Sequence, residues 1–169
     1  ISKMTGIMIP VVPESQIPES NIVFAVGKTK ANKKFENVFD KAVASSGSDS
    51  FVINTDGNTV SLVGGGDRGT LYSVYEFLEK CGCRWFFPGP LGEYVPHYES
   101  LPLPALKGLR SPYFIQREMD LGCNDYIPVE EQIDWCAKSR LNKVFALRDA
   151  IVKKYLPAGA KDAWEKRGG

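Results

Sequence analysis

Two alternating runs of apolar and polar residues flank one short turn and give the clearest pattern in the chain. Residues 51–55 and 59–63 are rich in β-branched side chains, and residues 56–58 (Asp-Gly-Asn) separate them. Asp-Gly between two such runs is typical of a tight β-hairpin. We therefore predict a strand pair whose second strand leads directly into three consecutive glycines, residues 64–66.

A stretch with helical spacing follows these glycines. Its apolar positions recur every three or four residues, which predicts one buried face. That face comprises Leu71, Val74, Tyr75, Leu78 and Cys81, whereas Glu76, Glu79 and Lys80 are expected on the side facing water. Asp67 is suited to cap this helix at its N-terminus, and Gly82 is suited to end it.

The chain before the hairpin carries shorter patterns. Residues 35–43 place apolar side chains on one helical face and predict a second amphipathic helix, with Gly47 just past its end. The apolar run 22–26 predicts a buried strand. Residues 1–4 followed by Gly6 are typical of the last turn of a helix.

After Pro112 the pattern changes to strand, helix and strand. Residues 113–119 predict a strand that carries charged side chains, Pro128 suits the first turn of a helix, and Asn142 is expected to end that helix. Residues 143–147 predict the second strand. A βαβ unit of this kind implies that its two strands pair in parallel.

Composition narrows the class of protein. The chain has 169 residues, of which 43% are hydrophobic and 24% charged, as in a globular protein with a substantial core. With 21 basic against 20 acidic residues, nothing indicates nucleic acid as a partner. No apolar run approaches the roughly 18 residues of a membrane span. The chain begins at Ile1 rather than Met, which leaves a processed N-terminus open.

The four cysteines do not form a recognisable disulfide or metal pattern. Cys81 and Cys83 flank a single glycine, a spacing at which neither a helix nor a strand readily forms a bridge. A metal site would need a second close pair of cysteines together with histidines. His97 is the only histidine in the sequence, and we expect it to be exposed to solvent. We predict buried or unpaired thiols, including Cys123 and Cys136, and neither a metal nor a cofactor.

The spacing of Gly64, Gly66 and Gly69 satisfies the dinucleotide-binding pattern G-x-G-x-x-G. That pattern needs a carboxylate about 20 residues later, at the end of a second parallel strand. Here no acid follows until Glu93, and the preceding strand belongs to a hairpin. A phosphate-binding loop fails as well, because Thr70 stands where the lysine should be. We therefore interpret residues 64–69 as a structural turn, in which Arg68 pairs with Asp67 or with a neighbouring loop.

The segments 64–79 (GGGDRGTLYSVYEFLE) and 81–89 (CGCRWFFPG) resemble the accessory α/β domain that precedes the catalytic barrel in several glycoside hydrolase families. They are similar to the N-terminal domain of family 67 α-glucuronidases and to the second domain of family 20 β-hexosaminidases. The resemblance is closest to uncharacterised glycosidase-like proteins of polysaccharide-degrading gut bacteria. It implies an α/β (α+β) domain over residues 1–104 that lacks its first strand and most of its first helix, and then a linker over 105–111.

Residues 112–169 are similar to the opening of the (β/α)₈ barrel in the same proteins. The resemblance implies a hydrolase that acts on glycans through its complete barrel, in a periplasmic, cell-surface or secreted setting. The catalytic acids would come from later strands, so this chain alone is expected to be inactive. The alternatives are a carbohydrate-binding or scaffold protein with a non-hydrolytic barrel, and an unrelated α/β domain that mediates protein contacts.

Three charged residues on the first barrel strand are the candidate substrate-binding residues. Family 20 enzymes carry a sugar-binding arginine on this strand, which implies that role for Arg117. Glu118 and Asp120 lie nearby and could bind sugar hydroxyls. An internal ion-pair network is the equally weighted alternative.

The remaining aromatic residues are assigned by their sequence context. Residues 85–87 (Trp-Phe-Phe) could stack on a sugar, although we expect them in the core, as we do Trp135. Trp164 lies in a polar tail and is expected to be exposed, or disordered where the rest of the barrel is absent.

Overall fold

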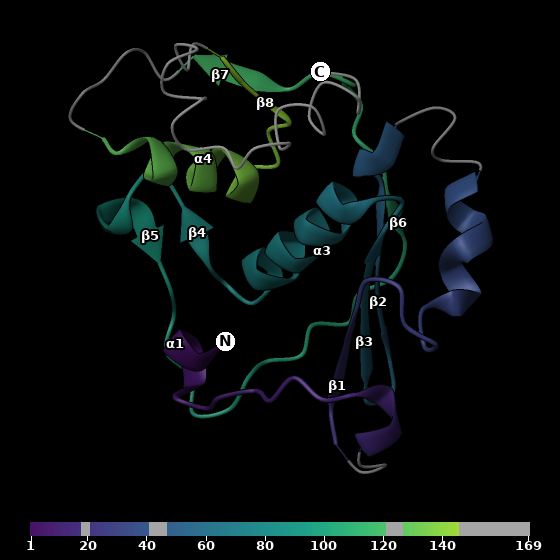
Figure 1. The fold of residues 1–169 in the computed structure, drawn as a ribbon. Helices are drawn as coiled ribbons and strands as arrows, with labels where there is room; N and C mark the ends of the chain where they lie inside the picture. The colour runs from purple at the N-terminus through teal and green to yellow at the C-terminus, as the bar shows by residue number, and fades with distance from the viewer. Residues whose placement is uncertain (18–20, 41–46, 121–126, 146–169) are drawn as a thin grey trace. The chain divides into compact units, whose positions relative to one another are not determined.

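The computed structural model describes residues 1–17, 21–40, 47–120 and 127–145, and the chain divides into two compact units (Figure 1). The first unit comprises Ile1–Arg84 and Tyr94–Ile115, and the second comprises Trp85–Glu93 and Gln116–Gly169. The predictions for Cys123, for Trp164 and for the end of the helix over 35–43 lie outside the described residues.

A four-stranded mixed sheet is the centre of the first unit. Its strands are β1 (Val23–Val26), β2 (Phe51–Asp56), β3 (Thr59–Gly64) and β6 (Leu109–Arg110), in the order β1-β3-β2-β6. β1 runs parallel to β3, whereas β2 runs antiparallel to both β3 and β6. Helices pack on this sheet, so the chain has the mixed α/β character that the sequence predicts.

The predicted hairpin is confirmed, with a one-residue change at its turn. Asp56 pairs with Thr59, so the two central residues are Gly57 and Asn58 rather than Asp-Gly. Gly57 has a φ of +55° and Asn58 does not share this conformation. A positive φ at the first central residue alone is characteristic of the type II′ hairpin turn, in which glycine is favoured at that position.

β1 differs from its prediction because it lies at an edge of the sheet. Ala25 is buried, but Val26 is 47% exposed, so this strand is not buried throughout. After it come a 3₁₀ turn, η2 (Lys33–Phe35), and α-helical residues 36–40. Phe39 from these residues packs with Val52 and Val63, as the predicted amphipathic face requires.

Helix α3 (Asp67–Lys80) packs against β2 and β3, but through a different face from the predicted one. Of the predicted positions Cys81 is buried, but Leu71 is exposed, and Val74, Tyr75 and Leu78 are only half-buried. The buried positions are Gly69, Tyr72, Ser73 and Phe77. Gly69 and Ser73 are small, so the helix can approach the sheet closely. A prediction from the spacing of apolar residues cannot detect a contact of this kind.

Gly82 follows the C-cap residue of α3. Its φ is +97°, and its N–H donates to the carbonyl of Glu79 while the N–H of Cys83 donates to that of Leu78. These two bonds constitute a Schellman motif, which satisfies carbonyls that the helix leaves without partners. The thiols of Cys81 and Cys83, on either side of Gly82, are buried and form no disulfide.

The segment expected to be a linker, residues 105–111, instead belongs to the sheet. β6 pairs with β2, and the carbonyls of Leu106 and Gly108 accept from the N–H groups of Thr55 and Ile53. Leu106 is buried. The chain therefore returns to the first unit and covers the edge of β2, a role that the local sequence of this segment, which contains Gly108 and no strong strand pattern, does not show.

Short elements complete the first unit. Helix α1 (Ser2–Thr5) ends at Gly6 in the left-handed conformation, as predicted. Buried Met4 lies 3.8 Å from Cys83, sulfur to sulfur, and its carbonyl accepts from the N–H of Tyr98. Two further 3₁₀ turns are η1 (Glu14–Gln16) and η3 (Gly47–Asp49).

The second unit contains the predicted strand-helix-strand pattern. β7 (Glu118–Asp120) and β8 (Lys143–Phe145) pair in parallel, with α4 (Val129–Lys138) between them in the sequence. β7 is shorter than predicted, because residues 113–117 are not part of it and Tyr113 is 92% exposed. The two-stranded sheet of β4 (Arg84–Trp85) and β5 (Glu93–Tyr94), with η4 (Pro90–Gly92) before β5, lies where the chain passes between the units.

Two predictions about this unit are wrong. Asn142 does not end α4: the helix stops at Lys138, and Arg140 takes the left-handed conformation with a φ of +58°. Phe86 and Phe87 are 68% and 51% exposed, so the expected aromatic core over residues 85–87 does not form in the described structure. They lie in the irregular connection after β4.

Candidate functional site

The turn between β3 and α3 places glycines where the backbone is most crowded. A Cβ added to Gly64 would lie 2.2 Å from the backbone nitrogen of Thr70, and one added to Gly69 would lie 2.5 Å from the carbonyl oxygen of Ser50. Neither glycine has a positive φ. These positions therefore need glycine for close packing rather than for an unusual backbone conformation.

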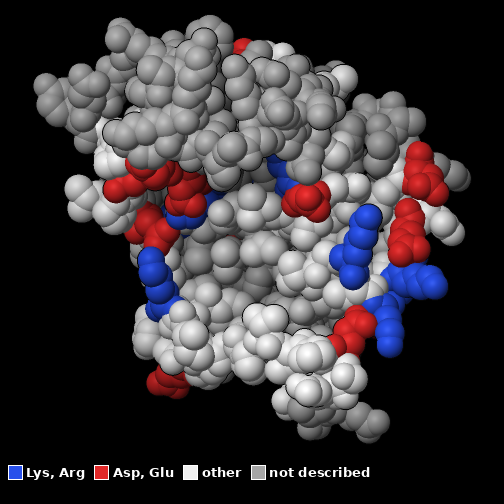
Figure 2. Space-filling model, viewed as in Figure 1, with Lys and Arg blue, Asp and Glu red and all other residues white. Residues whose placement is uncertain are grey.

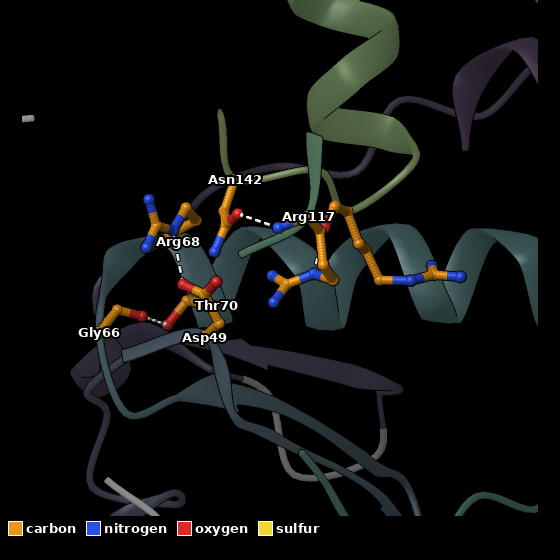
Figure 3. Close-up of polar contacts among 7 residues, drawn as sticks. Asp49, Gly66, Arg68, Thr70, Arg117 and Asn142 are labelled. Atoms are coloured by element: carbon orange, nitrogen blue, oxygen red, sulfur yellow. Dashed lines mark hydrogen bonds and ion pairs between the residues drawn. The ribbon is translucent and has the colours of Figure 1, made fainter. Parts of the chain in front are cut away.

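Hydrogen bonds within the turn already use two of its amides. The N–H of Gly64 donates to Thr70 Oγ1 at 3.0 Å, and the N–H of Gly65 donates to the carbonyl of Ser50 at 2.9 Å. Thr70 Oγ1 in turn lies 3.2 Å from the carbonyl oxygen of Gly66 (Figure 3). A phosphate-binding loop directs such amides at its ligand, whereas here they hold the turn together.

Asp67 does not cap α3 as predicted. Gly66 is the N-cap residue and makes no side-chain cap, while Asp67 is the first helical residue. A carboxylate in the first turn still interacts favourably with the positive end of the helix dipole.

Arg68 pairs with a neighbouring loop, one of the two partners that the sequence suggests. Its Nε lies 2.5 Å from Asp49 Oδ1, at the end of η3 (Figure 3). The side chain of Asp49 is 4% exposed and that of Arg68 25% exposed. This ion pair therefore ties the start of α3 to the segment that leads into β2.

A pocket of about 220 Å³ opens beside this turn. It lies at the carboxyl ends of β1 and β3, which are adjacent and parallel and so end at the same edge of the sheet. The residues that line it come from the segment after β1, from the helical residues 36–40 and from the end of β3: Lys28, Thr29, Asn32, Glu36, Phe39, Val63, Gly64 and Gly65.

Sequence reasoning missed the polar residues of this pocket. Lys28, Asn32 and Glu36 match no catalytic or metal-binding pattern, and only the fold brings them beside the glycine turn. The available signal was that two short apolar runs both end in glycine, at Gly27 and Gly64. That signal becomes informative only once the two runs are known to be parallel neighbours.

The predicted substrate-binding residues lie at different ends of β7. Arg117 precedes the strand: its N–H donates to Asn142 Oδ1 at 2.8 Å, and its Nε donates to the carbonyl of Arg140 at 2.9 Å (Figure 3). Glu118 is exposed and accepts a hydrogen bond from Gln116 Nε2. Asp120 ends the strand. The structure therefore does not present the three residues at one position.

A charged cluster in the second unit surrounds Lys138. Its Nζ lies 2.6 Å from Asp134 Oδ2 and 3.0 Å from Glu93 Oε2, and 5.7 Å from the centre of the Trp85 ring. Burial lowers the pKa of Lys138, but hydrogen bonds and charge attraction from Asp134 and Glu93 outweigh burial, so the pKa is raised overall. Trp135 is only half-buried, and its Nε1 donates to the carbonyl of Trp85.

The buried thiols are poor nucleophiles. Burial, together with the charge of Cys83, raises the pKa of Cys81 to about 11, and burial also raises that of Cys136. Nucleophilic cysteines have a lowered pKa, so neither thiol suits that chemistry. Both are unpaired, as predicted.

The described residues give little support for other kinds of site. They contain no group of three or more His, Cys, Asp or Glu side chains placed to hold a metal, and His97 is exposed. Acidic and basic side chains are mixed on the face drawn in Figure 2, which gives no electrostatic argument for a polyanionic partner. Within the same part of the chain, no helix combines the length and apolar character needed to cross a membrane.

Comparison with models of known protein families, with curated proteins and with solved structures finds no match to this chain.

Proposed function

We propose that this chain is the non-catalytic N-terminal part of a glycoside hydrolase, in which an accessory α/β domain precedes the first strands of a (β/α)₈ barrel. The observation that carries the proposal is the parallel β7-α4-β8 unit, which follows a mixed sheet with helices. A parallel strand pair with an intervening helix is the repeating unit of such barrels. The resemblance of residues 64–89 supplies the glycan-acting class.

The proposal locates the chemistry beyond this chain. Barrel enzymes bind substrate at the carboxyl ends of their strands, and Asp120 ends β7 at that edge. Arg117 lies at the opposite end, where its Nε donates to the carbonyl of Arg140, two residues past the end of α4. We accordingly assign substrate contact first to Asp120, and to Glu118 and Arg117 only as secondary candidates.

Turnover by the complete protein tests the proposal. The product of the full reading frame should hydrolyse at least one member of a panel of aryl glycosides and oligosaccharides, and the chain 1–169 should hydrolyse none. Hydrolysis by the chain 1–169 would overturn the non-catalytic assignment. Absence of hydrolysis by the folded complete protein across the panel would overturn the enzymatic one.

Variants of Arg117 and Asp120 in the complete protein separate structural from substrate roles. We expect Arg117→Ala to lower stability by about 1–2 kcal/mol, because it removes a charged donor to the Arg140 carbonyl, with a KM within twofold of wild type. Asp120→Asn should instead raise KM or lower kcat. The reverse pattern would return the sugar-binding role to Arg117.

Carbohydrate binding without hydrolysis is a second candidate, favoured by the exposed rings of Phe86 and Phe87. Exposed aromatic faces of this kind can stack on the apolar face of a sugar ring. If this is the function, Phe86→Ala and Phe87→Ala should weaken retention in affinity electrophoresis on soluble polysaccharide at least fivefold. The matched control is Tyr113→Ala, at an exposed ring elsewhere in the chain. Equal retention of all three variants would exclude this candidate.

A further inference from the structure

We infer that the pocket beside the glycine turn is a binding site for a small neutral polyhydroxylated molecule, of about the size of a monosaccharide. This inference concerns the accessory unit itself and does not depend on the function proposed above. It rests on the position of the pocket in the sheet, on one buried acceptor, and on the balance of charges around it.

The position of the pocket is one at which open α/β sheets bind ligands. β1 and β3 are parallel neighbours, and the helices that follow them lie on opposite sides of the sheet (Figure 1). Where two adjacent parallel strands send their connections to opposite faces, a crevice opens outside their carboxyl ends. The pocket occupies this crevice, and residues after both strands line it.

Asn32 provides the specific observation. It is 2% exposed, and its Nδ2 donates to the carbonyls of Ala25 and Gly27, both at 2.8 Å. These two acceptors fix the orientation of the amide, because a flipped amide would place its oxygen against two carbonyl oxygens. Oδ1 must therefore face away from them, and among the described residues it has no hydrogen-bond partner.

A buried acceptor without a partner is unfavourable by about 1–3 kcal/mol. Proteins rarely retain such a group unless a ligand or water satisfies it. The pocket that Asn32 lines has far more room than one water needs. Oδ1 lacks a donor, and a ligand in the pocket that Asn32 lines could supply one, an N–H or an O–H, once the side chains around this buried atom move to admit it.

The other polar groups narrow the chemistry of that molecule. Glu36 adds a second acceptor, Lys28 adds a donor, and the hydroxyl of Thr29 can do both. An inorganic anion would meet the Glu36 carboxylate and could offer few hydrogens to Oδ1, and a cation would meet Lys28. Sugar hydroxyls donate and accept at once, and they suit all of these groups.

The remaining lining is apolar and backbone. Phe39 and Val63 contribute hydrophobic surface, as is usual in pockets for small molecules. The amides of Gly64 and Gly65 are already bonded inside the turn, which argues further against a phosphate ligand. A volume of about 220 Å³ accommodates one small ring.

The test is titration of the ¹⁵N-labelled chain 1–169 with single compounds, followed by NMR. The probes are glucose, galactose, xylose and myo-inositol, each to about 20 mM, with inorganic phosphate as the anionic comparison. We expect at least one polyol to cause saturable shifts of the Asn32 side-chain amide and the Gly65 backbone amide. Phosphate should cause none at the same concentration.

Pocket variants confirm the location. Lys28→Met and Glu36→Gln change exposed side chains and should keep the fold, and each should raise the Kd of the bound polyol at least fivefold. Lys33→Met is the matched control, because it removes an exposed lysine that does not line the pocket. Asn32→Leu would also remove the bonds to β1, so it is interpreted only with its melting curve.

Three results would overturn the inference: no saturable shift with any polyol, which identifies a pocket filled by water alone; saturable shifts with phosphate alone; or equal effects of the Lys33 and Lys28 variants. Such a failure leaves hydrolysis by the complete protein unaffected. Conversely, polyol binding here would persist if the complete protein proved inactive.

Discussion

Two ion pairs in the first unit have the same chemistry and different surroundings. Arg68 and Asp49 meet at 2.5 Å where the carboxylate is almost fully buried, whereas Lys34 and Asp56 meet at 3.0 Å with both side chains more than half exposed. Charge attraction between exposed groups is largely offset by hydration and side-chain entropy. A buried carboxylate that loses its cationic partner is not rehydrated, so its charge remains uncompensated and the folded state is destabilised.

We therefore expect Arg68→Met to lower the free energy of unfolding by about 2 kcal/mol. Lys34→Met, the matched control, should change it by about 0.5 kcal/mol or less. Urea denaturation followed by circular dichroism gives both values. Equal effects of the two substitutions would mean that the Asp49 contact does not tie α3 to η3.

Helix α3 illustrates, at the scale of an element, how backbone contacts decide which face is buried. Gly64 and Gly69 bring the start of the helix against the end of β3, and this approach turns Tyr72, Ser73 and Phe77 toward the sheet. Ser73 is tolerated there because its hydroxyl donates to the carbonyl of Thr70 at 2.6 Å. A buried hydroxyl that has a hydrogen-bond partner avoids most of the free-energy cost of leaving water.

Gly64→Ala should be much more destabilising than an alanine at a glycine with open surroundings. Its Cβ would meet backbone atoms of Thr70 and Gly69 within 2.3 Å, so we expect a loss of about 3 kcal/mol or more. Gly57→Ala meets nothing within 4 Å and has only the strain of its positive φ, about 1 kcal/mol. Thermal melts rank the two, with soluble yield as the measure if Gly64→Ala fails to fold; similar losses would contradict the packing explanation.

These elements also show what the sequence could predict. The hairpin, the existence of α3 and the βαβ order follow from periodicity and turn residues, which are local properties. The buried face of α3, the edge position of β1 and the sheet role of residues 105–111 depend on partners distant in the chain. For the same reason the pocket residues Lys28 and Glu36 could not be identified, since no local pattern marks them.

At the scale of the whole molecule, titration gives a measurable signature. The pKa of Cys81 is raised from 9.0 to about 11, so an unfolded chain ionises this thiol at lower pH than the folded one. The stability linked to this group is present below pH 9 and is lost as the pH rises from 9 toward 11. The pKa of Lys138 is also raised, from 10.5, so this group contributes a further loss of folding stability at higher pH.

We expect the free energy of unfolding to fall between pH 9 and pH 11, and Cys81→Ala to flatten the lower part of that fall. Urea titrations at closely spaced pH values measure the slope. Lys138→Met serves as the comparison, because it should alter only the upper part. An unchanged slope in Cys81→Ala would show that this thiol is not shielded in the folded chain.

The return of residues 106–110 to the edge of β2 bears on how the protein is made. A ribosome releases the hairpin and α3 well before it releases β6, so for an interval β2 has an uncovered edge that can pair with another chain. The sheet of the first unit is therefore complete only after β6 has been made, and β6 follows residues 85–93, which belong to the second unit. A nascent chain that stalls before β6 has emerged would keep this edge of β2 uncovered.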